Sequence, residues 1–290
     1  MAATDAAPGL RAPWRTGGIV EVWRQRRLTW LIAKSQRSRR LYGTRLGRLW
    51  DYINPLTQFM VYFVVIGILL GLQRTVENFP LYIFSGLVTV QMFIGGLNGA
   101  TTAFTKNRLL VRRVAFPRQM LPIAHVVREF VSLGPPVVVL LIACVLLGWS
   151  PDATALLAAV GGLALISLFT YGLGLVAGVS MVFVRDTSQV VGVITTLARW
   201  ATPIIYPWTL VPDRFGDGLI TTLYLANPVT IGVFGMREAF WHPTVDEGLP
   251  PLPPEALVLG MTVTVVVVVL GHLMLARYQS AMVQRLRWTT

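Results

Sequence analysis

The sequence predicts an all-α integral membrane protein with six transmembrane helices. Hydrophobic residues make up 54% of the 290-residue chain, charged residues make up only 13%, and the mean hydropathy is +0.62. A soluble domain has roughly 25% charged residues. A helix needs about 20 mostly apolar residues to cross a bilayer, and six segments are long enough. They lie at residues 54–72, 80–104, 123–148, 154–183, 189–207 and 255–276.

The basic residues predict which side of the membrane each loop occupies. Lys and Arg concentrate in cytoplasmic loops, and an even number of spans places both termini on one side. Of the 25 Lys and Arg residues, eleven lie in the first fifty residues and five lie in the loop 105–119. We therefore expect both termini and this loop in the cytoplasm. Topology and anionic lipid then explain much of the net charge of +12, so nucleic acid is not an expected partner.

Two regions are not expected to span the membrane. Residues 17–50 alternate basic and apolar side chains, which predicts an amphipathic helix in the cytoplasmic interface. They belong to an N-terminal arm, 1–50, that precedes a transmembrane domain at 51–290. The region 207–254 has two short apolar pieces that meet at Asn227-Pro228, which predicts a pair of short re-entrant or interfacial helices.

Three of the spans carry a stripe of polar residues on one helical face, because their spacing follows the helical repeat. The members are Asn54, Gln58 and Tyr62 in the first span, Gln91 and Asn98 in the second, and Thr195, Arg199, Thr202 and Tyr206 in the fifth. One interpretation is hydrogen bonding between helices, which contributes about 0.6 kcal/mol per contact. The other is a polar translocation path, which three stripes together favour. Arg199 either lines this path or pairs with a structural partner such as a backbone carbonyl.

Motifs for catalysis and for nucleotide binding are absent from the sequence. There is no G-x-x-x-x-G-K-[ST] loop, and neither a serine nor Cys144 lies near a histidine in a nucleophile motif. The three histidines do not have metal-ligand spacing. We also find no acidic residue deep inside a span, as proton-coupled carriers need. The pattern disfavours an enzyme, a metal site and an ion-coupled carrier.

The loop at 105–119 combines an apolar side with a basic side. Leu109, Leu110 and Val111 form the apolar side with Val114 and Phe116, and Pro117 ends any helix. The basic side has Arg108, Arg112 and Arg113. Such a helix either rests on lipid headgroups or docks a cytoplasmic partner through its aliphatic and arginine side chains.

Six segments, in this order and spacing, identify a resemblance that covers about Tyr42 to Phe240. They are "YGTRLGRLWDYINPL", "FPLYIFSGLV", "RRVAFPRQMLP", "FVRD", "TPIIYP" and "NPVTIGVFGMREAF". The sequence resembles the permease subunits of type-2 ABC exporters, in the polysaccharide-export branch of the Wzm and TarG type. In that family the positions just before the "TP" of the fifth segment are apolar or aromatic, whereas this chain has Arg199-Trp200 there.

The resemblance implies a permease homodimer in the cytoplasmic membrane with two separate ATPase subunits. ATP and Mg would bind in the ATPase, and this chain would bind no cofactor. The implied gate helices match 219–240, and the implied path matches the polar stripes. Arg45 and Arg48 would contact the phosphate of a lipid-linked glycan or would anchor on headgroups. The implied coupling helix matches Asn107, Arg108, Leu109, Leu110, Val111, Arg112, Arg113 and Val114.

The composition also bears on the substrate. Arginine outnumbers lysine 23 to 2, which with abundant Ala, Val and Gly is typical of a GC-rich genome. That favours an actinobacterial polymer, such as the galactan precursor of a mycobacterial wall, over O-antigen or teichoic acid. A drug or small-lipid permease of the same family is the main alternative, followed by an ion-coupled carrier and a membrane glycosyltransferase.

Overall fold

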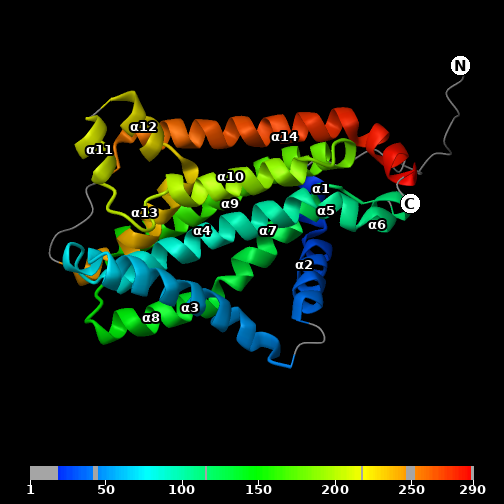
Figure 1. Cartoon of the computed structure of the whole chain (residues 1–290). Coiled ribbons are helices and arrows are strands. Elements are labelled where there is room, and N and C mark those ends of the chain that lie inside the picture. The colour runs from blue at the N-terminus through cyan, green and yellow to red at the C-terminus, as the bar shows by residue number, and fades with distance from the viewer. Residues whose placement is uncertain (1–18, 42–44, 115, 217, 246–251, 289–290) are drawn as a thin grey trace, which may run out of the picture.

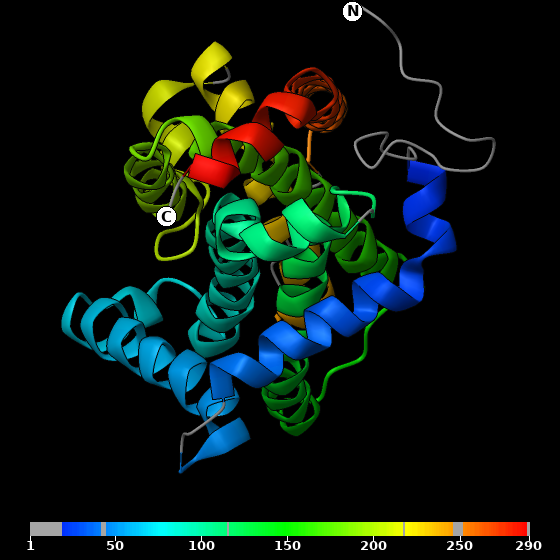
Figure 2. The same cartoon turned by 90° about the vertical axis from the view of Figure 1, so that its right-hand side faces the viewer.

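The structure is a computed structural model that describes residues 19–41, 45–114, 116–216, 218–245 and 252–288. Within these ranges every regular element is a helix, in agreement with the predicted all-α class. The long helices run along one common direction, and the N-terminal helix α2 lies across them at one end (Figures 1 and 2). The helix α6 and the end of α14 lie at the same end as α2, and α11 and α12 lie at the opposite end.

The predicted amphipathic segment forms α1 (Ile19–Arg24) and α2 (Arg26–Leu41). The second of these packs against α7, and it leaves Trp30 and Leu31 exposed. Exposed aromatic and aliphatic side chains among arginines are what a helix in a membrane interface presents to lipid. A short 3-10 turn, η1 (Gly47–Leu49), leads into the first span.

The first two spans are α3 (Trp50–Tyr62) with its extension η2 (Phe63–Leu69), and α4 (Phe79–Thr101). The extension η2 is a π-helix, and the 3-10 turn η3 (Leu72–Arg74) follows it. Helix α4 is the core of the molecule, because α7, α9, α10 and α13 all pack on it. It continues into α5 (Ala103–Lys106) and α6 (Arg108–Arg113).

Small residues bring α4 and α9 together. A Cβ atom added at Gly174 of α9 would lie 2.4 Å from the Cβ atom of Ala100 in α4. Such a contact is closer than real atoms allow, so the two backbones approach here only because the residue is glycine. Close approach through small residues is a common source of helix association in membranes.

The third and fourth spans lie close to their predicted positions, and the helix of the predicted sixth span extends beyond residue 276. The third consists of α7 (Met120–Ser132) and α8 (Gly134–Leu146), which meet beside Gly134-Pro135-Pro136, where the prolines lack backbone N–H donors. The fourth is α9 (Ala153–Phe183), whose first N–H bonds to the Asp152 carboxylate. The sixth is α14 (Pro254–Trp288).

The predicted fifth span differs from the structure. Instead of a helix over 189–207, α10 (Thr187–Ala201) has 15 residues, which is about 22 Å at 1.5 Å per residue. It ends at Ala201 because Pro203 disfavours the helical conformation of the residue before it, and Thr202 is extended. Among the described residues, five helices are therefore long and apolar enough to cross a membrane.

The pair of short helices predicted around Asn227-Pro228 is present. Helices α12 (Leu219–Leu225) and α13 (Pro228–Phe240) are bent by 65° at this point, and they give a sixth candidate span only if they are counted together. The Asn227 side chain accepts the N–H of Val229 and so begins α13. The helix α11 (Leu210–Phe215) precedes the pair and the 3-10 turn η4 (His242–Thr244) follows it.

Candidate functional site

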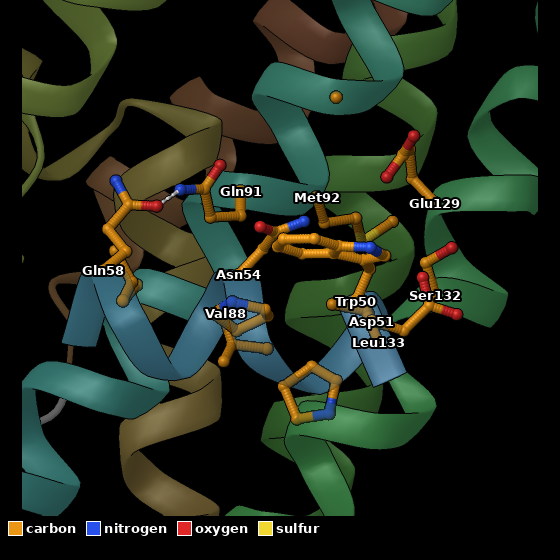
Figure 3. A pocket seen from close by; sticks show the side chains of 14 residues that line it. Trp50, Asp51, Asn54, Gln58, Val88, Gln91, Met92, Glu129, Ser132 and Leu133 are labelled. Carbon is orange, nitrogen blue, oxygen red and sulfur yellow. Dashed lines mark hydrogen bonds between the residues drawn. The ribbon is translucent and has the colours of Figure 1, made fainter. Parts of the chain in front are cut away.

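A polar cavity of about 220 Å³ lies between α3, α4 and the third span. Figure 3 shows the side chains of α3, α4 and α7 that line it. The polar atoms come from two carboxylates, three amides, a hydroxyl and an indole. The residues are Trp50, Asp51, Asn54, Gln58, Gln91, Glu129 and Ser132.

The stripes of the first and second spans meet at this cavity. The amide nitrogen of Gln91 donates a hydrogen bond to the amide oxygen of Gln58, and Asn54 lines the same space one turn away. The structure therefore brings together three of the residues predicted for the path. Tyr62, one turn further along α3, is half-buried and packs against the apolar core instead.

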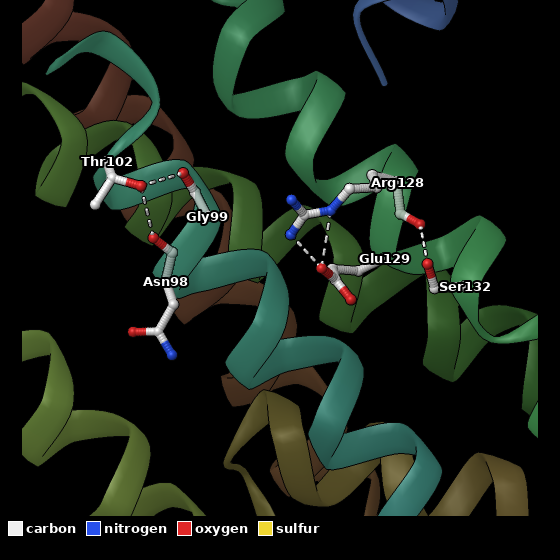
Figure 4. A network of polar contacts seen from close by, with 6 residues as sticks. All are labelled: Asn98, Gly99, Thr102, Arg128, Glu129 and Ser132. Atoms are coloured by element: carbon white, nitrogen blue, oxygen red, sulfur yellow. Dashed lines mark hydrogen bonds and ion pairs between the residues drawn. The ribbon is translucent and has the colours of Figure 1, made fainter. Parts of the chain in front are cut away.

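An ion pair on α7 supplies the cavity with one of its carboxylates. The Arg128 guanidinium donates to the Glu129 carboxylate through Nε, at 3.0 Å, and also through Nη2 (Figure 4). Ser132, one turn later, donates its hydroxyl to the Arg128 carbonyl at 2.9 Å. A Cβ atom at Gly95 of α4 would lie 2.7 Å from the Glu129 carboxyl carbon, so glycine leaves the room that this carboxylate fills.

A second ion pair joins the N-terminal helix to the cavity. The Arg37 guanidinium of α2 donates to the Asp51 carboxylate of α3 at 2.7 Å. Asp51 lines this cavity, while Arg37 lines a separate cavity between α2 and α7. This contact positions α2 relative to the first turn of the first span.

The other stripe residues lie away from the cavity. Asn98 is exposed, and its backbone carbonyl accepts the Thr102 hydroxyl (Figure 4). The fifth-span residues belong to α10 and the segment after it, which do not line the cavity.

The fifth stripe makes mainly local contacts. The Thr195 hydroxyl donates to the Gly192 carbonyl, and the Tyr206 hydroxyl donates to the Trp200 carbonyl. The buried Thr202 hydroxyl has no hydrogen-bond partner in the described part of the chain. Arg199 is half-buried, and none of the described residues forms an ion pair with it.

The predicted coupling segment forms the short helix α6, which buries one of its apolar side chains and exposes the others. Val111 is buried in a cluster with Leu275 and Met282 of α14. Leu109, Leu110 and Val114 are exposed. Arg108 and Asn107 begin this helix, and the side chains of Arg112 and Arg113 lie outside the described residues, as does that of Arg48.

A buried arginine holds the turn after α6 against α14. The Arg118 side chain is only 4% exposed, and its Nη1 donates to the Gln279 carbonyl of α14 at 2.8 Å. Burial lowers the pKa of the Arg118 guanidinium below its ordinary value. This arginine of the basic loop therefore ties α14 to the loop and is not presented to a partner.

A wholly buried arginine lies on α13. The Arg237 guanidinium lies 3.4 Å from the ring centre of Tyr82 and donates to the carbonyls of Tyr82, at 3.3 Å, and Ile204, at 3.2 Å. No described acidic residue forms an ion pair with it. It belongs to the region 207–254, which was not expected to span the membrane, and the structure places it in the interior between α4 and α13.

Residues 27–241 match the family described as ABC-2 type transporter. This chain belongs to the ABC-2 type transporter family. The match runs from α2 to the end of α13 and includes both ion pairs, the cavity, α6 and Arg237. The ABC-2 chain is accordingly a multi-pass membrane subunit of a transporter and not an enzyme.

Similar proteins are O-antigen export permeases. This ABC-2 chain is 26% identical over 233 residues to the O-antigen export system permease protein RfbA of Myxococcus xanthus, covering 80% of this chain and 87% of that protein. It is 25% identical over 211 residues to a protein of the same name from Klebsiella pneumoniae, covering 71% of this chain and 77% of that one. These relatives agree with the polysaccharide-export branch that the sequence resembles.

Three charged residues that make buried contacts in this ABC-2 permease were not predicted as site residues from the sequence: Asp51, Glu129 and Arg237. From the sequence we placed Glu129 near one face of the membrane, and the structure buries its side chain in the protein within the candidate span Met120–Leu146. The adjacent charges Arg128 and Glu129 inside an apolar segment were the available signal, because charges in a span are costly unless they are paired. An arginine within the apolar helix after Asn227-Pro228 was the signal for Arg237.

Proposed function

We propose that this chain is the permease of an ABC exporter that moves a lipid-linked cell-surface polysaccharide across the cytoplasmic membrane. The observation that carries the proposal is the cavity in which Gln58 and Gln91 meet beside Trp50 and Glu129. Amides and carboxylates match the hydroxyl groups of a sugar as donors and acceptors, and an indole face packs on its C–H groups. The names of the relatives support the same substrate class.

The permease would act as a homodimer with two copies of a separate ATPase subunit, which binds ATP and Mg. The outward face of α10, with exposed Val193, Leu197 and Trp200 beside Arg199, is suited to a second copy or to lipid. In the dimer the fifth-span stripe would complete a path that the first- and second-span stripes begin. Both termini and the loop 105–119 would face the cytoplasm, as the basic residues predict.

Among glycans, the arginine-rich composition favours the galactan precursor of an actinobacterial wall. Arg45 is exposed at the entry to the first span, where it can reach a lipid phosphate. Arg48 is proposed for the same role on its sequence position alone. O-antigen and teichoic-acid polymers share the polyhydroxyl chemistry to which the cavity is suited.

The ATPase would dock on α6, where Leu109 and Leu110 are exposed next to Arg112 and Arg113. We expect Arg112→Glu with Arg113→Glu to abolish co-purification of the ATPase, because the glutamates that replace the docking arginines repel acidic residues on the partner. Membrane insertion should stay unchanged. Arg74→Glu, on an exposed turn at the other end of the molecule, is the matched control. Normal assembly and export in the double variant would contradict docking at α6.

The central test is depletion of the protein in cells. Lipid-linked glycan should accumulate on the cytoplasmic side and disappear from the surface, and re-expression should reverse both changes. The buried Glu129 favours one alternative, an ion-coupled carrier, because such carriers use acids inside spans. Export by the purified chain in vesicles with an ion gradient and no ATPase would establish that alternative.

A further inference from the structure

A second cavity, of about 320 Å³, lies between α2 and α7 and has a different chemical character. Its lining contains three cationic side chains, Lys34, Arg37 and Arg128, together with the Ser38 hydroxyl and the Trp30 ring. None of the residues that line it is acidic. We call this space the basic pocket.

Each arginine of the basic pocket is held by a carboxylate that belongs to the polar cavity. Arg37 bonds to Asp51 through Nη2, and Arg128 bonds to Glu129 through Nε and Nη2. A guanidinium has five N–H donors, and in the described part of the chain Nη1 of neither arginine has a hydrogen-bond partner, so it can bind a ligand. Lys34 is exposed, and within the described residues no carboxylate pairs with it.

We propose that the basic pocket binds the diphosphate or phosphate headgroup of a lipid. Phosphate oxygens are matched by the planar fork of an arginine and by the point charge of a lysine, and a serine hydroxyl adds a further donor. The choice of a lipid-borne phosphate rests on the proposed function and on Trp30, whose ring is about half exposed where an interfacial helix meets lipid.

The basic pocket and the polar cavity are linked by their shared ion pairs. Arg37 and Arg128 lie in the pocket, while Asp51 and Glu129 lie in the cavity. A phosphate that binds Nη1 of either arginine competes with the carboxylate on the same guanidinium for its positive charge. Headgroup binding therefore weakens both ion pairs and frees two carboxylates to accept hydrogen bonds from sugar hydroxyls.

The first experiment measures binding of farnesyl diphosphate to the purified full chain in nanodiscs, with inorganic pyrophosphate and farnesol as comparison ligands. We expect Lys34→Gln to weaken farnesyl diphosphate binding about tenfold, since it removes one charge-assisted contact. Arg27→Gln is the matched control, because Arg27 is exposed on the same helix and does not line the pocket. Thermal unfolding midpoints equal to that of the wild type establish that both variants fold.

Three results would overturn the assignment. Equal weakening by Lys34→Gln and Arg27→Gln would mean diffuse surface charge. Weakening by Arg45→Gln alone would place the phosphate at the entry to the first span. Equal affinity for pyrophosphate and farnesyl diphosphate would show that the pocket does not recognise the lipid chain. Tighter binding of farnesyl diphosphate supports a lipid-borne phosphate.

The second experiment tests the link between the pocket and the cavity. Glu129→Gln should tighten farnesyl diphosphate binding several-fold, because Arg128 loses the carboxylate that competes for it. Glu21→Gln on α1 removes the same charge outside both cavities and should leave the affinity unchanged. Unchanged affinity in Glu129→Gln, or the same gain in both variants, would contradict the link.

The two proposals fail in different experiments. If Lys34→Gln binds like the wild type while depletion still traps lipid-linked glycan inside cells, the pocket assignment is wrong and the export function stands. If the pocket binds as expected but depletion traps no glycan, the export function is wrong and the lipid-phosphate site stands.

Discussion

Two arginines of this permease, one partly buried and one wholly buried, have opposite surroundings. Arg128, on α7, lies beside a carboxylate that neutralises it, and it lines the basic pocket. Arg237, on α13, is wholly enclosed, and its described contacts are the Tyr82 ring and two backbone carbonyls. A cation paired with a side-chain carboxylate can exchange that partner for a ligand. A cation held by a fixed ring and fixed carbonyls cannot, so we regard Arg128 as part of a site and Arg237 as a structural lock.

The largest expected effect comes from Arg237. Arg237→Ala removes the contact with the Tyr82 ring and two hydrogen bonds and leaves a cavity, so it should destabilise the protein by roughly 3 kcal/mol or more. Arg237→Lys should recover only part of this loss, because an ammonium cannot reproduce the planar geometry. Thermal unfolding in detergent measures both variants. An unfolding midpoint like that of the wild type in Arg237→Ala would refute the structural lock.

The next effect concerns the ion pair on α7. Glu129→Gln should cost about 1–2 kcal/mol of unfolding free energy, because the Arg128 guanidinium loses a charged acceptor. The double variant Arg128→Gln with Glu129→Gln should cost less than the sum of the single variants, since neither charge is then left alone. Additive losses in this double-mutant cycle would show that the two side chains do not depend on each other.

A smaller effect is expected at the glycine that faces Glu129. Gly95→Ala places a methyl group against the carboxylate and should cost about 1 kcal/mol, while it also displaces Glu129 from the cavity. Gly161→Ala on α9 is the matched control, since no atom lies within 4 Å of the position of its added Cβ. That control should be neutral or slightly stabilising, because alanine favours helix. Equal stability of the two variants would mean that Glu129 moves aside freely.

The sequence was sufficient for features that depend on local patterns. Apolar length predicted the spans that contain α3, α4, α7 with α8, α9 and α14, and Asn227-Pro228 predicted the bend between α12 and α13. Helical spacing also placed Gln58 and Gln91 on faces that prove to meet. The end of α10 at Ala201 could also have been predicted, because Pro203 follows closely. The predicted fifth span relied on apolar character alone and therefore extended too far.

The candidate site was less accessible because its contacts join distant parts of the chain. Arg37 and Asp51 are 14 residues apart, and Arg237 and Tyr82 are 155 residues apart. No periodic pattern encodes such pairs, since they depend on how whole helices pack. The roles predicted for Asn107–Val114, Arg199, Arg45 and Arg48 involve partners or substrate and stay predictions.

The structural lock at Arg237 affects which helices unfold locally at the end of the molecule that contains α11, α12 and α13. Nearly all of α13 is buried, and the Trp149 and Trp241 indoles donate to the carbonyls of Ala239 and Glu77 beside it. By contrast, Leu219 and Leu223 of α12 are largely exposed. Backbone amides exchange with solvent according to the local free energy of opening. In a hydrogen–deuterium exchange experiment α12 should therefore label early and α13 late, and the boundary between them should fall at Asn227-Pro228.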